Sequence, residues 1–122
     1  MCIRDSGHAY TGRPTNFIMD GTDASLDTLI ASVDQGLLIT RFWYIRFVDP
    51  MKLLLTGMTR DGLFWIENGT IQYGVKNLRF NESPLNVINN IEMFGDPKRV
   101  GGSSHVPSLK IRDFTFTSGT SF

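Results

Sequence analysis

The segment Gly36–Phe80 restricts the possible folds most, because it consists of apolar runs separated by short turn signals. The runs are rich in Val, Ile, Leu, Phe, Trp and Tyr, which fit the pleated surface of a sheet. Asp61-Gly62 and Asn68-Gly69 are pairs that a two-residue type I′ hairpin prefers, since both of its central residues need positive φ. The segment therefore predicts an antiparallel β-meander.

Within this segment the pattern predicts consecutive strands joined by tight turns. The first, Leu37–Val48, is apolar at both alternating sets of positions, so we expect both of its faces to be covered somewhere along its length. A turn at Asp49-Pro50-Met51 follows, because proline cannot join a central ladder. The strands expected after that turn are Lys52–Thr59, Leu63–Glu67, Thr70–Tyr73 and, after a bulge at Gly74, Val75–Phe80.

Two other segments carry the periodicity of amphipathic helices, and each has one apolar face expected to pack on the sheet. In the first, Asp23 is placed as the N-cap and Gly36 as C′. In the second, Ser83-Pro84 is a favoured N-cap and N1 pair, and Gly95 ends the helix. The apolar faces consist of Leu26, Leu29, Ile30 and Val33 in the first helix, and of Leu85, Val87, Ile88, Ile91 and Phe94 in the second.

The remaining segments complete an α+β class of fold. Asn16–Met19 is expected as a short strand, Asp96–Val106 as a loop, and Leu109–Phe116 as a last strand before the polar tail Thr117–Phe122. Helices separated from a run of antiparallel strands are typical of α+β proteins. We expect an antiparallel meander of about 5–7 strands with two packed helices.

Charge and composition exclude several classes of function. Twelve basic and 12 acidic residues give a net charge of zero, which creates no field that attracts a phosphate backbone, so no nucleic-acid partner is expected. No apolar run approaches the roughly 20 residues that a membrane span needs. The single cysteine, Cys2, excludes an internal disulfide and favours a reducing, cytoplasmic setting.

No complete catalytic motif is present. The sequence contains no H-E-x-x-H, C-x-x-C, G-x-S-x-G or P-loop pattern. Ser103-Ser104-His105 places a hydroxyl beside an imidazole, but a triad also needs a third group and an oxyanion hole. In its Gly-Gly-Ser-Ser context this segment is expected to be a mobile connection. His8, in a Gly- and Pro-rich segment, is expected to be a solvated side chain.

Aromatic and basic side chains in the expected strands have structural explanations. Trp43 and Trp65 are assigned to core packing or to a subunit interface. The arginines are expected to be solvated strand ends or ion-pair partners, although an arginine near a cleft would hold a peptide carboxylate. These arginines are Arg41, Arg46, Arg60 and Arg79.

Four sequence segments carry a resemblance to a known family. NFIMDGTDASLDTLIASVDQGLLIT, TGMTRDGLFWIENGTI, VKNLRFNESPL and VPSLKIRDFTFTSG follow one another between Gly7 and Gly119. In order and spacing they resemble the C-terminal domain of the TldD/PmbA family, metallopeptidase-related proteins also labelled modulators of DNA gyrase. Residues 7–122 are therefore expected to be such a domain with the upstream part missing. Met1–Ser6, MCIRDS, reads as an adapter-derived artefact at the start of a metagenomic contig.

The resemblance implies a zinc metallopeptidase complex inside the cell that acts on unfolded peptides, in peptide maturation and proteolysis. It implies a homologous TldD/PmbA-type subunit as partner, in a homo- or heterodimer, with this domain contributing scaffold, cleft and subunit interface. The alternative is a non-catalytic, PmbA-like partner subunit without metal.

The residues that hold zinc in the family cannot be carried over to this chain. The family binds zinc through an H-E-x-x-x-H motif, which this chain lacks, and a cysteine expected near Val100–Val106, where the sequence reads VGGSSHV. No catalytic residue and no metal ligand is therefore assigned, and the zinc is expected in the parent complex. His105 is the one candidate for a substitute ligand.

Overall fold

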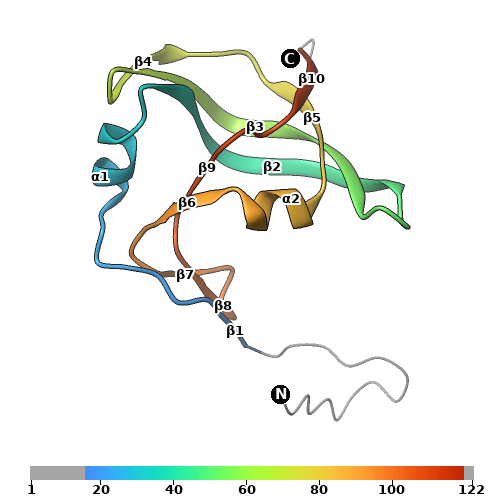
Figure 1. Ribbon diagram of the computed structural model, residues 1–122, viewed down its shortest axis with the longest axis horizontal. Coiled ribbons are helices and arrows are strands. Elements are labelled where there is room, and N and C mark those ends of the chain that lie inside the picture. The colour runs from blue at the N-terminus through green and yellow to red at the C-terminus, as the bar shows by residue number, and fades with distance from the viewer. Residues whose placement is uncertain (1–15, 120–122) are drawn as a thin grey trace.

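The computed structural model describes residues 16–119 (Figure 1). The predictions for Met1–Ser6 and His8 lie outside these residues. The expected α+β class is confirmed, with a mostly antiparallel arrangement of strands and two short helices. The elements are β1 (Phe17–Ile18), α1 (Leu26–Ala31), β2 (Gln35–Asp49), β3 (Leu54–Glu67), β4 (Thr70–Gly74), β5 (Leu78–Glu82), α2 (Pro84–Asn89), β6 (Ile91–Phe94), β7 (Lys98–Val100), β8 (Ser104–Val106), β9 (Leu109–Ile111) and β10 (Phe116–Gly119).

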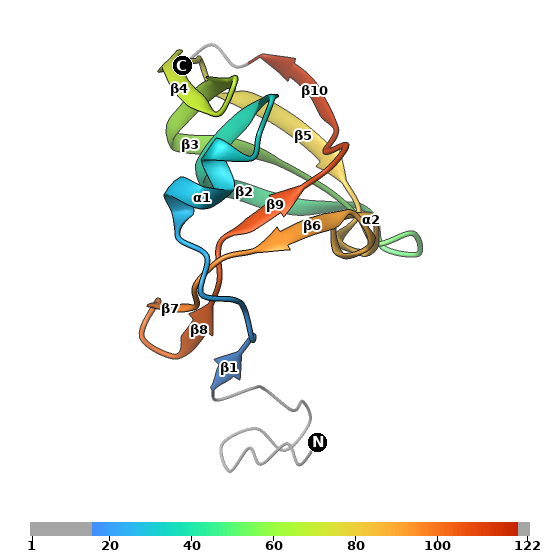
Figure 2. The ribbon, with the colours of Figure 1, turned by 60° about the vertical axis from the view of Figure 1, so that its left-hand side comes forward.

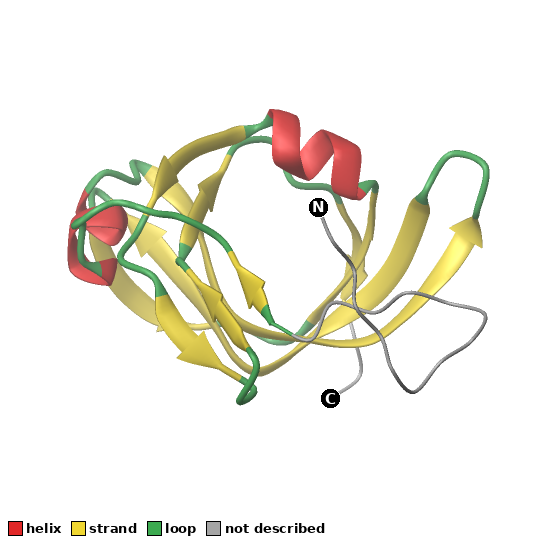
Figure 3. Cartoon of the chain, turned by 90° about the horizontal axis from the view of Figure 1, so that it is seen from below, coloured by secondary structure: helices red, strands yellow, loops and turns green. Residues whose placement is uncertain are grey.

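The central element is a five-stranded sheet in the order β10-β5-β3-β2, with β4 also paired to β3. Its longest pairing joins β2 and β3, whose hairpin end projects at the right of Figure 3. The predicted turn after β2 is confirmed. Asp49 Oδ1 accepts hydrogen bonds from the backbone N–H groups of Met51, at 3.0 Å, and Lys52, at 3.4 Å, as aspartate does in Asx-turns.

The predicted hairpin at Asn68-Gly69 is also confirmed. These residues join β3 to β4 and have φ values of 50° and 73°, the positive values that a type I′ turn requires. The backbone N–H of Asn68 donates to Asp34 O at 2.7 Å, and that of Gly69 donates to Val33 O at 2.8 Å. The hairpin is thereby fixed to the segment that follows α1.

The hairpin predicted at Asp61-Gly62 is wrong, because β3 runs straight through these residues. They form a bulge: three steps along β3, from Leu63 to Arg60, oppose two steps along β2, from Ile39 to Arg41. Asp61 and Gly62 have φ values of 63° and 146°, so the bulge uses the same backbone freedom as a hairpin turn. Because β3 stays paired with β2 on both sides of these residues, they form a bulge and not a hairpin turn.

The return along β3 is interrupted near this bulge. β4 ends at Gly74, and β5 begins at Leu78, so the predicted disruption at Gly74 is confirmed, while the predicted strand Val75–Phe80 begins three residues later. Both β4 and β5 pair with the same edge of β3. They therefore act as two halves of one returning strand.

A cluster of aromatic rings packs on the inner face of the sheet and forms one part of the core. The ring centroid of Phe80 lies 4.9 Å from that of Phe42 and 5.4 Å from that of Phe114, distances typical of favourable aromatic pairs. Phe116 packs on Phe114 at 5.2 Å. The cluster joins three segments that are far apart in sequence. The buried apolar residues are Leu29, Met58, Leu63, Ile66 and Phe80.

The expectation that both faces of Leu37–Val48 are covered somewhere along its length is wrong for Thr40–Val48, while Leu37–Ile39 are half-buried. From Thr40 to Val48 this part of β2 is exposed, with Phe47 61% exposed. The physical reason is that β2 ends the sheet order, so it has one neighbour strand among the described residues. A continuous apolar run is typical of buried strands, but here it marks an edge strand.

Both helices are shorter than predicted. α1 has Ser25 as its N-cap, where Ser25 Oγ accepts from the Thr28 N–H at 3.2 Å, and Gly36 lies in β2 instead of ending the helix. The predicted start of α2 at Ser83-Pro84 is confirmed, but α2 ends at Asn89. The segment Ile91–Phe94 forms β6, because pairing with β9 outweighs its helical spacing.

The C-terminal third contains more strand than predicted. The expected loop Asp96–Val106 folds as the β7–β8 hairpin, and β8 also pairs in parallel with β1. The expected last strand is divided: β9 pairs with β6, and β10 continues through part of the expected tail and joins β5 (Figure 2). Asp113, with φ of 56°, lies between these two strands.

Candidate functional site

A groove of about 870 Å³ lies along the first half of β2, within the 300–1,000 Å³ typical of ligand sites. Its opposite wall is the segment 107–116, which includes β9. A smaller hollow of about 430 Å³ lies against α1 and shares part of this lining. The apolar side chains of the groove are Leu26, Leu37, Leu38, Ile39, Phe42, Trp65, Pro107, Leu109, Ile111, Phe114 and Phe116.

The strand that forms one wall of the groove has an edge without a partner. β2 has 15 residues and is the last strand in its sheet, so within residues 16–119 no strand pairs with its second edge. β9 likewise has a single partner strand there, β6, and lies between β6 and β2 (Figures 1 and 2). An unpaired edge presents free backbone N–H and C=O groups to another extended chain.

The outer face of the same sheet gathers the four arginines that the sequence scatters over three strands. Side chains of directly paired residues project on the same side of a sheet. Arg41 pairs with Arg60, and Trp43 pairs with Met58. The two pairs are two residues apart on both strands, so their side chains project on the same side. Met58 in turn pairs with Arg79 of β5. All of them therefore lie on the side opposite to Phe42 and Phe80.

Arg46 reaches this outer face through a second bulge. Trp43 pairs with Met58 and Arg46 pairs with Thr56, so three steps along β2 oppose two along β3. Tyr44, with φ of 59°, is at this bulge. Without the additional residue, the alternation of side chains would direct Arg46 to the inner face.

The arginines on this face stack on aromatic rings. The guanidinium carbon of Arg60 lies 4.5 Å from the centroid of the Trp43 ring, and that of Arg41 lies 5.5 Å from it. Arg46 lies 3.8 Å from the centroid of the Tyr44 ring and donates to the Tyr44 hydroxyl. Distances below about 6 Å are those of cation–π attraction.

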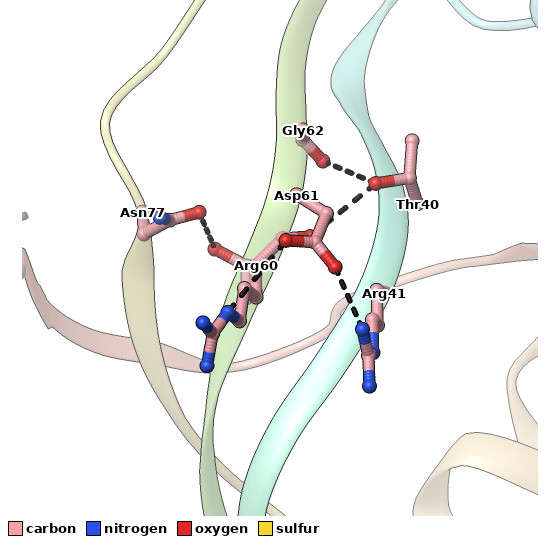
Figure 4. A network of polar contacts seen from close by, with 7 residues as sticks. Thr40, Arg41, Arg60, Asp61, Gly62 and Asn77 are labelled. Atoms are coloured by element: carbon pink, nitrogen blue, oxygen red, sulfur yellow. Dashed lines mark hydrogen bonds and ion pairs between the residues drawn. The ribbon is translucent and has the colours of Figure 1, made fainter.

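Asp61 reduces the repulsion between Arg41 and Arg60, which are direct neighbours across the strands (Figure 4). Arg41 Nη1 donates to Asp61 Oδ2 at 2.8 Å, and Arg60 Nε lies 3.6 Å from Asp61 Oδ1. The three side chains are 46–55% exposed, so each ion pair contributes only about 0.2–1 kcal/mol. The outer face thus carries four guanidinium groups and one carboxylate, so the net charge of these five residues is strongly positive.

A buried carboxylate fixes the far wall of the groove. Glu82 is 7% exposed; its Oε1 accepts from the Ser83 N–H at 2.9 Å and from Asn86 Nδ2 at 3.2 Å, and its Oε2 accepts from the Thr115 N–H at 3.0 Å. Burial alone would raise the pKa of Glu82, but these hydrogen bonds outweigh it and hold the pKa below its ordinary value. Glu82 thereby connects β5, α2 and the segment between Phe114 and Phe116.

His105 and the two serines before it do not form a catalytic arrangement. Gly101 and Gly102, with φ of 61° and 80°, turn the chain between β7 and β8, and Ser103-Ser104-His105 follows that turn. His105 pairs with Arg99 of β7 and with Ile18 of β1 and is exposed. Ser104 and His105 are consecutive in β8 and project to opposite faces. The prediction that this segment is a loop is wrong for Ser104 and His105, because both lie in the paired strand β8.

The described residues do not provide a zinc site by themselves. Between residues 16 and 119, no group of three or more His, Cys, Asp or Glu side chains is arranged to hold a metal ion. The loop where the family resemblance places a cysteine offers the imidazole of His105 alone, whereas structural and catalytic zinc sites use three or four protein ligands. Residues 16–119 also contain no helix long and apolar enough to cross a membrane.

Sequence reasoning missed two parts of this site. Glu82 was not singled out, because nothing in the sequence distinguishes a buried glutamate from an exposed one. The groove lining from Pro107 to Phe116 was not associated with β2, because about 70 residues separate the two segments. A usable signal was the set of aromatic residues Phe114 and Phe116 near the C-terminus, which must pack against an apolar surface elsewhere.

The sequence profile described as the PmbA/TldA metallopeptidase C-terminal domain matches residues 2–118. The fold and the match together define the class: an α+β domain from a metallopeptidase-related family. The chain belongs to the TldD/PmbA family.

Three solved structures have the same fold. A protein described as a modulator of DNA gyrase, from Bacteroides thetaiotaomicron VPI-5482, has 26% identity and a TM-score of 0.71 over 84% of this chain and 23% of that chain. A protein of the same description from Thermotoga maritima MSB8 has 22% identity and a TM-score of 0.74, over 91% and 26%. TldE from Thermococcus kodakarensis has 13% identity and a TM-score of 0.70, over 81% and 23%.

The chain spans about a quarter of the length of each of these proteins. A comparison with curated proteins gave no match.

Proposed function

We propose that this chain is the C-terminal domain of a TldD/PmbA-type zinc metallopeptidase complex that acts on unfolded peptides, in peptide maturation or proteolysis. The domain contributes scaffold, cleft and subunit interface to that complex. The observation that carries the proposal is the unpaired edge of β2 along an apolar groove. Membership of a family described as metallopeptidases supports the class of reaction.

The unpaired edge explains why the substrate is an unfolded chain. An extended peptide adds to a sheet edge through its main-chain N–H and C=O groups, which a folded protein has already paired. These hydrogen bonds place few demands on sequence. Every second side chain of the peptide then enters the groove, where residues such as Leu38 and Phe42 of β2 provide apolar contacts.

The zinc of this proposal belongs to the parent complex, because the described residues of this chain do not supply its ligands. No step of the reaction is assigned to residues of this chain, whose role is to bind and to position. The expected partner is a homologous subunit, in a homo- or heterodimer. We propose that the complex works in the cytoplasm.

The test uses the complete parent protein, purified together with a homologous subunit. We expect bound zinc by elemental analysis and cleavage of an unfolded peptide, but not of the same sequence within a stable folded protein. A peptide with N-methyl groups at alternate positions is the matched control, since it keeps its side chains but loses half of its main-chain donors. If neither zinc nor cleavage is found, the peptidase assignment fails.

The second candidate function is a non-catalytic PmbA-like partner subunit without metal. It is favoured by the segment Val100–Val106, which lacks the cysteine that the family resemblance leads us to expect. In this case the domain uses the same edge and interface but no chemistry occurs in its own subunit. An H-E-x-x-x-H motif in the parent sequence would contradict this alternative.

A further inference from the structure

Two arginines lie beside the unpaired edge of β2, on its outer face. Arg41 and Arg46 are on either side of Trp43 in the strand, and the bulge at Tyr44 brings Arg46 to the same face as the other two. A strand added to this edge would project every second side chain over that face. Cross-strand neighbours have Cβ atoms only about 4.5–5.5 Å apart, so those side chains would meet the two arginines.

Both guanidinium groups are oriented before any partner arrives. Arg41 donates a hydrogen bond through Nη1 to the Asp61 carboxylate, and the Arg46 guanidinium stacks on the Tyr44 ring. A guanidinium has five N–H donors, so each retains donors for a second acceptor. A side chain already held by stacking also loses less conformational freedom when it binds.

The surrounding charge adds to this preference for acidic partners. Arg60 lies one strand further from the edge, and Arg79 lies two strands further, on the same face. Asp61 is the one carboxylate that pairs with an arginine of this face among the described residues. The edge differs along the first half of β2, as far as Phe42, where it borders the apolar groove.

We propose that this edge selects extended peptides that carry Asp or Glu at every second position, with Arg41 and Arg46 as the specificity-determining residues. The inference rests on the proposed function, because it requires a peptide to pair with β2. It adds a substrate class: acidic side chains over the outer face, alternating with apolar or small side chains on the inner side, where Phe42 borders the groove.

The test measures binding of fluorescent nine-residue peptides to the chain by anisotropy, at low salt. One peptide alternates Glu with Val and Thr, a second has Gln for each Glu, and a third repeats the first with N-methyl groups that prevent strand pairing. One exposed ion pair changes affinity by roughly 1.4- to 5-fold. Two such pairs predict that the Glu peptide binds about 2- to 30-fold more tightly than the Gln peptide, and that salt reduces the difference.

The variants Arg41→Gln and Arg46→Gln are each expected to lose about 1.4- to 5-fold in affinity for the Glu peptide. Neither is expected to change binding of the Gln peptide. Arg99→Gln is the matched control, since Arg99 is exposed on β7, in a different sheet. Arg46→Gln is the cleaner variant of the two, because Arg41 also forms an ion pair within the sheet.

The possible outcomes are distinct. Equal binding of the Glu and Gln peptides overturns the inference and leaves edge binding intact. Absence of binding for both peptides contradicts the proposed edge binding itself, and the inference with it. Arginine-dependent binding that N-methylation does not affect also overturns the inference, since the peptide would not be a paired strand. A single-stranded DNA of equal charge that binds more tightly, with the same dependence on Arg41 and Arg46, would replace it with nucleic-acid binding.

Discussion

Replacing the buried carboxylate of Glu82 tests how the far wall of the groove is held. In Glu82→Gln, one oxygen can keep the bonds from Ser83 and Asn86, but the new NH₂ group faces the Thr115 N–H, so two donors meet. A buried donor left unpaired costs about 1–3 kcal/mol. Loss of charge removes roughly 1 kcal/mol more from each remaining bond. We expect the free energy of unfolding to fall by about 3–5 kcal/mol, a large share of a typical 5–15 kcal/mol.

The assay is urea unfolding of the 122-residue chain, with Glu92→Gln as control. Glu92 is an exposed glutamate with one ion pair, to Lys110 at 3.3 Å, so its loss is expected to cost less than about 1 kcal/mol. If Glu82→Gln costs no more than Glu92→Gln, the three hydrogen bonds do not stabilise the fold as argued.

The pH dependence provides a second test of the same carboxylate. Because the folded pKa of Glu82 lies below its ordinary value of 4.5, its contribution is complete above pH 4.5. The contribution is lost as pH falls through the lower, folded pKa. The difference in stability between wild type and Glu82→Gln should therefore be constant near neutral pH and decrease in acid. A difference that stays the same from pH 7 to pH 3 would refute the reasoning.

Three further substitutions are expected to change the free energy of unfolding, measured by urea or thermal denaturation. Gly69→Ala should cost at least about 1–2 kcal/mol, because φ is 73° and a Cβ would lie 2.6 Å from the carbonyl oxygen of Ala31; an unchanged midpoint would contradict this geometry. Thr59→Val should cost about 1–3 kcal/mol, since the fully buried Thr59 hydroxyl donates to Asn77 at 3.1 Å and accepts from the Leu78 N–H at 3.0 Å; exposed Thr70→Val is the control. Asp61→Asn should cost only about 0.2–1 kcal/mol per lost ion pair, and a loss that 1 M salt does not reduce would argue against an electrostatic origin.

The two Gly-containing dipeptides show how far local sequence determines this sheet. Asn68-Gly69 and Asp61-Gly62 carry the same backbone preference, and in both cases the structure uses positive φ. Which of them becomes a hairpin depends on whether the next segment pairs with β3 or continues it, and that is set by contacts with β2. The sequence therefore predicted the conformation of these residues but not the connection that follows them.

The arginine face shows why the candidate site was only partly predictable. Arg41 and Arg46 are five positions apart, so simple alternation assigns them to opposite faces of a strand. The additional residue at Tyr44 restores them to one face, and a bulge of this kind has no reliable signal in a run such as Trp43-Tyr44-Ile45. The segment Ile91–Phe94 presents the same difficulty, because its apolar residues satisfy helix and strand periodicity equally.

The unpaired edge of β2 also bears on how copies of this chain behave toward one another. Within residues 16–119, no strand covers the second edge of the 15-residue β2, and such an open edge is a template for self-association. Because the bulge at Tyr44 adds one residue, Arg41 and Arg46 are equally far along the strand from Trp43. If the β2 edges of two copies paired antiparallel with Trp43 at the centre, Arg41 of one copy would therefore face Arg46 of the other. Like charges directly opposite each other are destabilising. We therefore expect the same arginines to act as gatekeepers against aggregation. Light scattering should increase in the double variant Arg41→Gln/Arg46→Gln, even though neither substitution adds an apolar group.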